Sequence, residues 1–320
     1  MSMETLARFE DVLDAAARIA PHALVTPVLR ADALDALVGC TLAFKAECRQ
    51  RKGAFKFRGA CNAVFALAEA DAARGVVTHS SGNHGASLAL AARMRGIPCH
   101  VVVPEGAVRS KVAAIAAEGA VLHRCAPTIA ARETACAQVQ RDTGATLVHP
   151  YADARVIAGQ GTAVLELLGD HPDLDVVVVP VGGGGLAAGT ALTLAGRAPH
   201  VRLFLAEPAG AADTLQSLQR GERVTDVVPD TICDGLRGTL GAPNFRLLRE
   251  LGAEVLAIDD ADSIAAMRLL LEQLRLLVEP SSAIALAAIL RHPQRFAGQR
   301  VGVVLSGGNV DLDALPWATP

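Results

Sequence analysis

One lysine, Lys56, stands between two phenylalanines in the stretch GAFKFRGA. Lysine is seldom fully buried unless another group pairs with it, so its apolar neighbours suggest more than a surface role. Burial lowers the pKa of a lysine, and the resulting free amine can act as a nucleophile or a base. The alternative is a lysine whose stem covers apolar surface while its ammonium stays in water.

Four consecutive glycines, Gly182, Gly183, Gly184 and Gly185, separate the apolar run VVVVPV from an alanine-rich stretch. Such a loop presents backbone N–H groups at the start of a helix, where a phosphate is favoured. It matches neither G-x-G-x-x-G nor the P-loop pattern, and glycines also form ordinary turns. We favour the phosphate site.

Polar side chains gather in a second loop, HSSGNHG, which holds Ser80, Ser81, Asn83 and His84. Two hydroxyls, an amide and an imidazole can hold a carboxylate, although serine and asparagine are also common helix caps. Ser306 follows the apolar run VGVVL, where its hydroxyl either ends a strand or meets a ligand.

Short β-branched runs alternate with alanine- and leucine-rich stretches, among them TLAFKAE, GVVTHSS, CHVVVPE, DVVVVPVG and RVGVVLSGG. This alternation predicts an α/β protein with largely parallel, buried strands. Several of the expected strands end in small or polar residues. Because ligands bind beyond the carboxyl ends of strands in open α/β sheets, these endings are candidate walls of one site.

The composition favours a globular protein that binds a small molecule. The chain has 320 residues, of which 51% are hydrophobic, so it can bury a large core in two domains or in one domain with an insertion. Its net charge of −3 creates no field that would attract nucleic acid or an anionic membrane.

Cysteine usage and the apolar segments indicate a cytoplasmic location. The 7 cysteines form no C-x-x-C pair, so we expect reduced thiols rather than a zinc site or a disulfide framework. The first residues lack the layout of a signal peptide, and the one long apolar run is interrupted by proline and glycine. We therefore expect no membrane span.

Seven blocks of the sequence together resemble one enzyme family. They are ECRQRKGAFKFRGACNAV, VVTHSSGNHG, HPYADARVIAGQGT, VVPVGGGGLAAG, LAEPAGAAD, VEPSSA and VLSGGNVD. Their order and spacing are similar to those of the fold-type II pyridoxal-phosphate (PLP) enzymes, in the group of serine/threonine dehydratases and serine racemases. The resemblance implies a tryptophan synthase β-like fold: an open, mostly parallel, twisted sheet in a large domain (1–74 and 152–320) with a smaller α/β domain (75–151) inserted. Members of the family are commonly homodimers.

The resemblance also assigns roles at the cofactor. Lys56 matches the lysine that binds PLP covalently, and Phe55 is expected to pack beside the ring. Asn83 matches the residue that hydrogen-bonds the ring hydroxyl oxygen, and Ser306 matches the residue that faces the pyridine nitrogen. The four glycines and Leu186 would bind the phosphate through backbone N–H groups.

β-Elimination is the expected reaction. A neutral hydroxyl at the pyridine nitrogen makes PLP a weaker electron sink, which favours prompt loss of a β-leaving group. Lys56 would remove the Cα proton as general base, while Ser80 and His84 contact the substrate. The products would be a 2-oxo acid and ammonia, from L-serine or L-threonine, or from 3-hydroxyaspartate or phenylserine.

Two other functions stay open. Ser81 matches the residue on the opposite face of the cofactor in serine racemases, so Lys56 and Ser81 could act as two bases of a serine or aspartate racemase. A non-catalytic nucleotide- or phosphosugar-binding protein would use the glycine loop alone.

Further acidic and basic residues have two interpretations each. Glu207, the Ala211 carbonyl and Asp213 match a divalent-cation site of racemase-like members and suit Mg²⁺, Ca²⁺ or Mn²⁺, although acids after a strand are usually solvated or capping. Glu279 matches a carboxylate near the cofactor or simply begins a helix. Arg132 aligns with a substrate-facing arginine of some members, and we prefer an exposed helix residue.

Several positions depart from the family pattern. Glu118 replaces a common tyrosine, and Lys52 and Ala86 replace the threonine and glutamine of nucleotide-responsive racemases, so activation by ATP is not expected. Tyr151 stands where racemases have asparagine after HP, which favours elimination.

Overall fold

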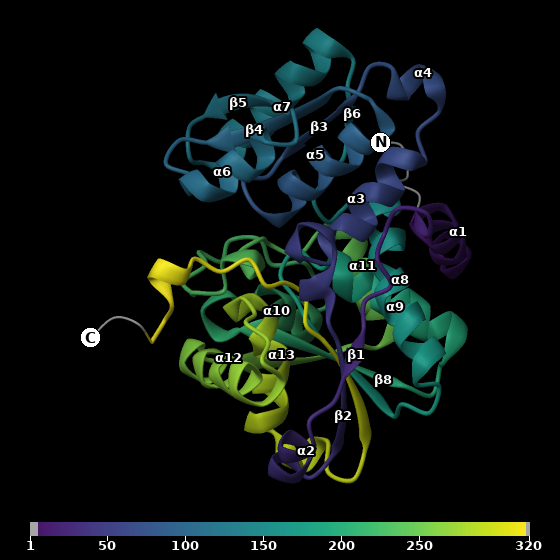
Figure 1. The fold of residues 1–320 in the computed structure, drawn as a ribbon, viewed down its shortest axis with the longest axis vertical. Helices are drawn as coiled ribbons and strands as arrows, with labels where there is room; N and C mark the ends of the chain where they lie inside the picture. The colour runs from purple at the N-terminus through teal and green to yellow at the C-terminus, as the bar shows by residue number, and fades with distance from the viewer. Residues whose placement is uncertain (1–5, 318–320) are drawn as a thin grey trace.

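The chain folds around two β-sheets, which lie one above the other in Figure 1. The computed structural model describes residues 6–317. The upper sheet has 4 strands and the lower sheet has 6. The predicted α/β class with a mostly parallel sheet is confirmed.

The six-stranded sheet is parallel except at one edge, where β1 runs antiparallel to β2. In spatial order its strands are β1 (Val28–Leu29), β2 (Thr41–Lys45), β10 (Arg300–Val304), β7 (Val176–Pro180), β8 (Arg202–Pro208) and β9 (Glu254–Ile258). The last strand of the chain, β10, lies between β2 and β7, where Val303 pairs with Phe44 and with Val178. The carboxyl ends of segments far apart in sequence therefore share one edge.

Both faces of this sheet are buried, as the uninterrupted apolar sequence of β7 requires. Successive strand residues point to opposite faces, so Val176 and Val178 join one core while Val177 and Val179 join the other. The first core contains α13 (Pro280–Arg291), and the second contains α8 (Ala154–Asp170) and α9 (Gly185–Arg197).

The remaining helices cover the edges and the upper sheet. Around the lower sheet are α1 (Phe9–Ile19), α2 (Asp32–Val38), α10 (Asp213–Arg220), α11 (Ala242–Leu251) and α12 (Asp260–Leu274). Around the upper sheet are α4 (Glu69–Ala72), α5 (Asn83–Arg95), α6 (Arg109–Ala116) and α7 (Ile129–Thr143).

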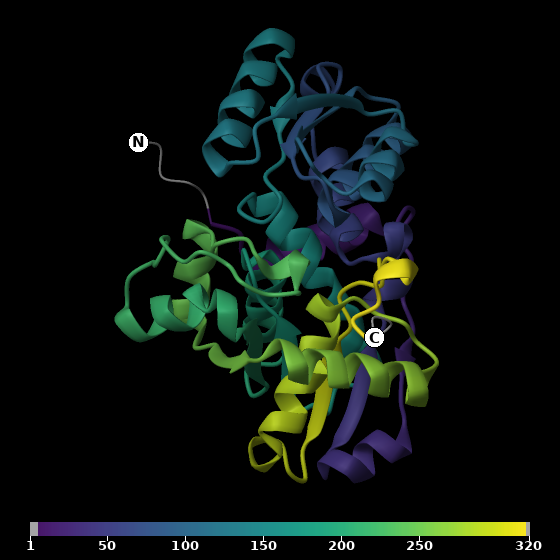
Figure 2. The same ribbon diagram turned by 90° about the vertical axis from the view of Figure 1, so that its left-hand side faces the viewer.

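The four-stranded sheet is entirely parallel. Its strands are, in spatial order, β5 (Val121–Cys125), β4 (Cys99–Pro104), β3 (Val76–His79) and β6 (Thr146–Leu147). Figure 2 shows this sheet and its helices as a separate layer above the rest of the chain. All of its strands fall within the range expected for the smaller domain, 75–151, and the division of the chain at these boundaries stays a prediction.

The helix that carries Lys56, α3 (Lys56–Phe65), packs directly on α8. A Cβ on Gly159 would lie 2.6 Å from the Cα of Gly59, so the two backbones touch at a place where only glycine fits. The backbone N–H of Gly59 also donates to Oε1 of Gln160, at 3.1 Å. This close contact fixes the position of the first turn of α3, which carries Lys56, relative to α8.

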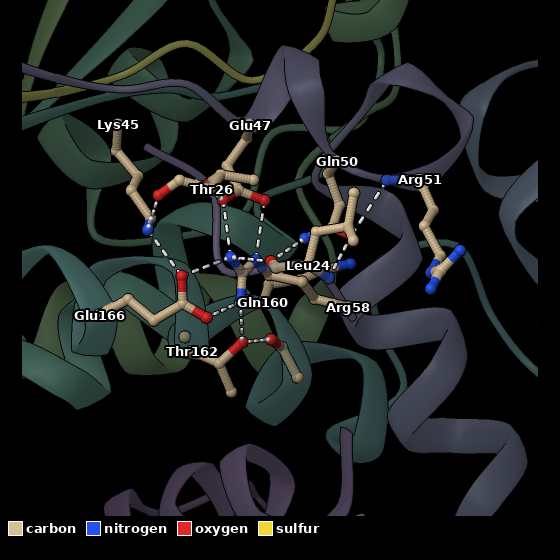
Figure 3. A network of polar contacts seen from close by, with 12 residues as sticks. Leu24, Thr26, Lys45, Glu47, Gln50, Arg51, Arg58, Gln160, Thr162 and Glu166 are labelled. Atoms are coloured by element: carbon tan, nitrogen blue, oxygen red, sulfur yellow. Dashed lines mark hydrogen bonds and ion pairs between the residues drawn. The ribbon is translucent and has the colours of Figure 1, made fainter. Parts of the chain in front are cut away.

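A buried ion network lies beside the same helix (Figure 3). Arg58, which is 0% exposed, donates to the carboxylates of Glu47 and Glu166 at 2.7 to 2.8 Å. Lys45 donates to Glu166 at 2.6 Å and to the Thr26 carbonyl at 2.7 Å. The two cations are thus paired with two carboxylates, and this attraction offsets the cost of removing the four charges from water.

Within residues 6–317, no helix combines the length and the apolar character that a bilayer crossing would need.

Candidate active site

Lys56 sits at the carboxyl edge of the lower sheet. It begins α3, and the residue before it, Phe55, donates its backbone N–H to the Ser306 carbonyl at 2.9 Å. Ala54 forms an isolated antiparallel bridge with Gly307. These backbone contacts place Lys56 beside Ser306, which follows β10 and is only 3% exposed.

The amine of Lys56 lies in a half-buried, weakly polar setting. Its Nζ donates to the Pro150 carbonyl at 3.0 Å and lies 5.0 Å from the centre of the Phe55 ring. Burial lowers the pKa of Lys56 to about 8, against the opposing effect of the Glu279 carboxylate. A substantial fraction of the amine is therefore unprotonated at mildly alkaline pH, as its apolar sequence neighbours predict.

The glycine loop connects β7 to the 13-residue helix α9. Gly184 has a φ of +88°, a region that favours glycine. A Cβ on Gly183 would overlap the ring of Tyr151, and a Cβ on Gly182 would lie 2.7 Å from the Cα of Leu236. Side chains are thus excluded on several sides, and the first N–H groups of α9 have no intrahelical partner. This cradle fits a phosphate.

The second polar loop meets the strand ends through Asn83, the first residue of α5. Its Nδ2 donates to both carboxylate oxygens of Glu279 at 3.1 Å, and its Oδ1 accepts from Asn309 at 2.9 Å. The structure therefore brings Asn83, from the upper layer, together with residues that follow β10 and precede α13.

Glu279 is 5% exposed, and burial raises its pKa to about 7. A Cβ on Gly307 would lie 2.5 Å from its Oε1. Of the two interpretations of Glu279, the structure supports a carboxylate at the site, although the residue also precedes α13.

His84 points inward rather than toward the loop surface. Its Nε2 is 3.3 Å from the Val148 carbonyl, and because a carbonyl only accepts, Nε2 carries the proton. Nδ1 is buried without a hydrogen-bond partner among the described residues, and burial holds the pKa of His84 well below its usual range. Its contact with substrate stays a prediction.

The two serines of the loop are half-buried, and the Ser80 hydroxyl accepts from the Gly82 N–H at 3.4 Å. Ser81 is within the same loop, two residues before Asn83, and its role toward the substrate stays a prediction.

Arg132, on α7, is half-buried rather than exposed, and its Nε is enclosed without a hydrogen-bond partner among residues 6–317. Its charge lowers the pKa of His79, the residue that precedes Ser80, although burial is the larger cause of that shift. Arg132 therefore lies within electrostatic reach of the loop.

The expected cation ligands lie at the end of β8. Glu207 accepts from the backbone N–H groups of Thr214 and Leu215 at 2.7 and 2.9 Å, and Asp213 accepts from Leu240 N–H at 2.8 Å. Burial raises the pKa of Glu207 to about 7. Both carboxylates thus serve as backbone caps in this structure.

Ala211 lies in the short helix η3 (Ala209–Ala211), immediately before Asp213. Two carboxylates and a backbone carbonyl are hard oxygen donors that suit Mg²⁺, Ca²⁺ or Mn²⁺. Across the part of the chain that the structure describes, no group of three or more His, Cys, Asp or Glu side chains is arranged to hold a metal ion.

Sequence reasoning missed the segment 149–152, which runs between β6 and α8. Pro150 supplies the carbonyl that holds Lys56, the Tyr151 ring packs on Gly183, and the Tyr151 backbone packs on Gly185. The signal for this segment is HPY, His149 to Tyr151, which lies within one of the family-like blocks.

Comparisons with known proteins agree with this geometry. The family model described as "Pyridoxal-phosphate dependent enzyme" matches residues 19–307. A beta-hydroxyaspartate dehydratase of Paracoccus denitrificans (strain Pd 1222) is 48% identical over 309 residues, which cover 97% of this chain and 98% of the relative. A serine racemase of Arabidopsis thaliana is 46% identical, with 93% and 92% covered.

A solved structure, that of maize serine racemase, superimposes with a TM-score of 0.94 at 44% identity and covers 96% of this chain and 95% of its own. The family resemblance and the PLP cofactor expected from the sequence are therefore confirmed. This chain belongs to the family of pyridoxal-phosphate-dependent enzymes.

Proposed function

We propose that this protein is a PLP-dependent dehydratase that converts a β-hydroxy amino acid to a 2-oxo acid and ammonia. The observation that carries the proposal is the half-buried Lys56, whose pKa is lowered to about 8, which lies beside the end of β10 and whose Nζ donates to the Pro150 carbonyl. When bound, PLP withdraws electrons from the substrate Cα and weakens its C–H bond.

Residues of the chain would bind each part of the cofactor and accept the substrate proton. The glycine loop and the N-terminus of α9 would hold the phosphate, and Asn83 would hydrogen-bond the ring hydroxyl. Ser306 would present a neutral hydroxyl to the pyridine nitrogen, and Phe55 would pack beside the ring. Lys56 accepts the Cα proton.

The substrate carboxylate is held by the loop that runs from Ser80 to His84. The hydroxyl on Cβ then leaves with a proton as water, and hydrolysis of the resulting enamine gives the 2-oxo acid and ammonia.

We propose 3-hydroxyaspartate as the preferred substrate. The relative at 48% identity is named a beta-hydroxyaspartate dehydratase. In addition, the half-buried guanidinium of Arg132 offers a cation to a second carboxylate near the loop. L-Serine and L-threonine lack that carboxylate, so they gain nothing from Arg132.

The test is release of 2-oxo acid from purified, PLP-loaded protein with threo- and erythro-3-hydroxyaspartate, L- and D-serine, L-threonine and phenylserine. We expect the highest kcat/KM with one isomer of 3-hydroxyaspartate, and loss of both the visible absorption of lysine-bound PLP and the activity in Lys56→Ala. Release from none of these compounds would contradict the dehydratase. A colourless protein would instead indicate a non-catalytic role.

Amino-acid racemisation is the second candidate, because Ser81 lies in the loop that also holds Asn83 and relatives named serine racemase cover more than 90% of this chain. Interconversion of enantiomers that is lost in Ser81→Ala while elimination persists would establish it.

We also propose a divalent cation at Glu207, Ala211 and Asp213, with Mg²⁺, Ca²⁺ or Mn²⁺ as candidates. The oxygen donor set supports this structural ion. Thermal unfolding of the holoenzyme with chelator, and after readdition of each ion, tests it. Asp213→Asn should abolish the response.

A homodimer in the cytoplasm completes the proposal. The seven cysteines are free thiols, as a reducing compartment allows. Light scattering of the holoenzyme measures the oligomeric state.

A further inference from the structure

The turn formed by residues 149–152 touches both halves of the site. Its Pro150 carbonyl accepts from Lys56 Nζ at 3.0 Å. The Tyr151 ring supports the glycine loop so closely that a Cβ on Gly183 would overlap it and a Cβ on Gly185 would lie 3.1 Å from the Tyr151 Cα. Movement of this short turn would therefore displace the amine and the phosphate cradle together.

The turn is closed by the side chain of its first residue. Nδ1 of His149 accepts from the backbone N–H of Ala152 at 3.1 Å and, more weakly, from that of Tyr151 at 3.4 Å. A backbone N–H can only donate, so Nδ1 is unprotonated and the proton of the neutral imidazole is on Nε2. His149 thus acts on its own backbone as Asn does in an Asx turn.

A second contact fixes the far side of the turn. Nδ2 of Asn244, on α11, donates to the Tyr151 carbonyl at 3.0 Å and to the Gly183 carbonyl at 2.5 Å. The turn and the glycine loop are therefore joined by one side chain, and the His149 contacts are what hold the opposite end.

The groups that face the His149 ring keep it neutral. The Tyr151 ring stands edge-on at 4.5 Å and the His79 ring at 5.1 Å between ring centres. Burial, reinforced by His79 and Lys56 and opposed by Asp153, lowers the pKa of His149 to about 4. Nδ1 stays an acceptor at every pH at which the Lys56 amine is free.

We propose that His149 is a positioning residue that acts through Nδ1: it holds the turn so that the Pro150 carbonyl meets Lys56 and the Tyr151 ring supports the glycine loop. The inference concerns the proposed site, but it requires PLP binding and not the proposed substrate. The competing role for His149 is donation from Nε2–H to a substrate.

Two isosteric variants separate these roles. The side-chain oxygen of Asn occupies nearly the position of Nδ1, so His149→Asn keeps the acceptor. The longer His149→Gln places its amide near Nε2 instead. His200→Asn, a change at an exposed histidine, is the matched control.

The first measurement is the Kd of PLP for the cofactor-free protein, followed by the visible absorption of lysine-bound PLP. We expect His149→Asn and His200→Asn to stay within about threefold of the wild type. His149→Gln should lose about tenfold or more, the loss that corresponds to one hydrogen bond of roughly 1.4 kcal/mol. The pH at which the absorption band titrates should move only in His149→Gln.

If PLP affinity and the titration pH of the absorption band match the wild type in His149→Gln but not in His149→Asn, the proposal is overturned in favour of a role for Nε2. Unchanged values in all three variants would also overturn it. If His149→Gln does not fold, His149→Ala takes its place as the variant that lacks the acceptor: a loss of PLP affinity in His149→Ala but not in His149→Asn supports the acceptor role, and a loss above tenfold in His149→Asn refutes it. A wild type that binds PLP but releases no 2-oxo acid would refute the dehydratase while leaving this comparison intact.

Discussion

At the scale of single residues, the chemistry depends on a lysine and a carboxylate that are both partly stripped of water. Burial lowers the pKa of Lys56 to about 8 and raises that of Glu279 to about 7. Both shifts disfavour the charged form, which is the direction that desolvation requires. Each shift has a measurable consequence.

The rate at which cofactor-free protein takes up PLP should rise with pH and level off above about pH 8, since only the neutral Lys56 amine reacts with the PLP aldehyde. The Glu279 carboxylate raises the pKa of Lys56. Glu279→Gln should therefore move the rise to lower pH. Stopped-flow absorbance measures the rate, and a rise centred near pH 10.5 would contradict the lowered pKa.

Glu279 should also make folding less favourable as the pH increases. Its pKa is about 7 when folded and 4.5 as an unperturbed group, so the folded protein binds the extra proton between these values. Because the folded state binds more protons there, the free energy of unfolding falls as pH rises from 4.5 to 7. Urea unfolding of cofactor-free Glu279→Gln should show a smaller fall than the wild type. Parallel pH curves for the two proteins would exclude this contribution.

At the scale of elements, α3 is held in place by the glycine contact with α8 and by the buried ion network beside it. The sequence singles out Lys56, the glycine loop and Ser306 as candidates because strand ends and small residues are local patterns. It could not place Glu279 on Asn83, which is 196 residues away in the chain. It also missed His149, whose bonds to its own backbone exist only in one turn geometry.

Glu47→Gln should destabilise the protein by roughly 3–5 kcal/mol, because it leaves the buried Arg58 guanidinium undercompensated. Neither Arg58 nor Glu47 is exposed, each at 0%. Glu254→Gln is the control, since the Arg295–Glu254 pair is about 40% exposed and should contribute less than about 1 kcal/mol. Urea unfolding of both variants gives the comparison, and equal losses would show that the network does not stabilise α3.

At the scale of the whole molecule, two ion pairs connect the upper layer to the lower one. Lys111 on α6 pairs with Asp234 in the short helix η4 (Asp234–Leu236). Glu118, in the turn after α6, pairs with Lys52. Lys52 adopts a φ of 59°, a left-handed conformation that costs energy in a non-glycine residue.

Both ion pairs are at the α6 side of the upper layer. They therefore favour the arrangement in which the polar loop HSSGNHG of the upper layer faces Lys56.

Asp234→Lys should therefore raise KM several-fold while changing the free energy of unfolding by less than about 1 kcal/mol, because the pair is partly exposed and lies outside the hydrophobic cores. Its side chains are 29% and 46% exposed, so high salt should raise the wild-type KM toward that of the variant. The exchange Lys111→Asp with Asp234→Lys re-forms the pair and should restore KM, whereas Glu254→Lys, which breaks a pair within the lower layer, should leave KM unchanged. If the exchange does not restore KM, the effect of Asp234 is local to η4, and closure of the upper layer over the substrate does not depend on this ion pair.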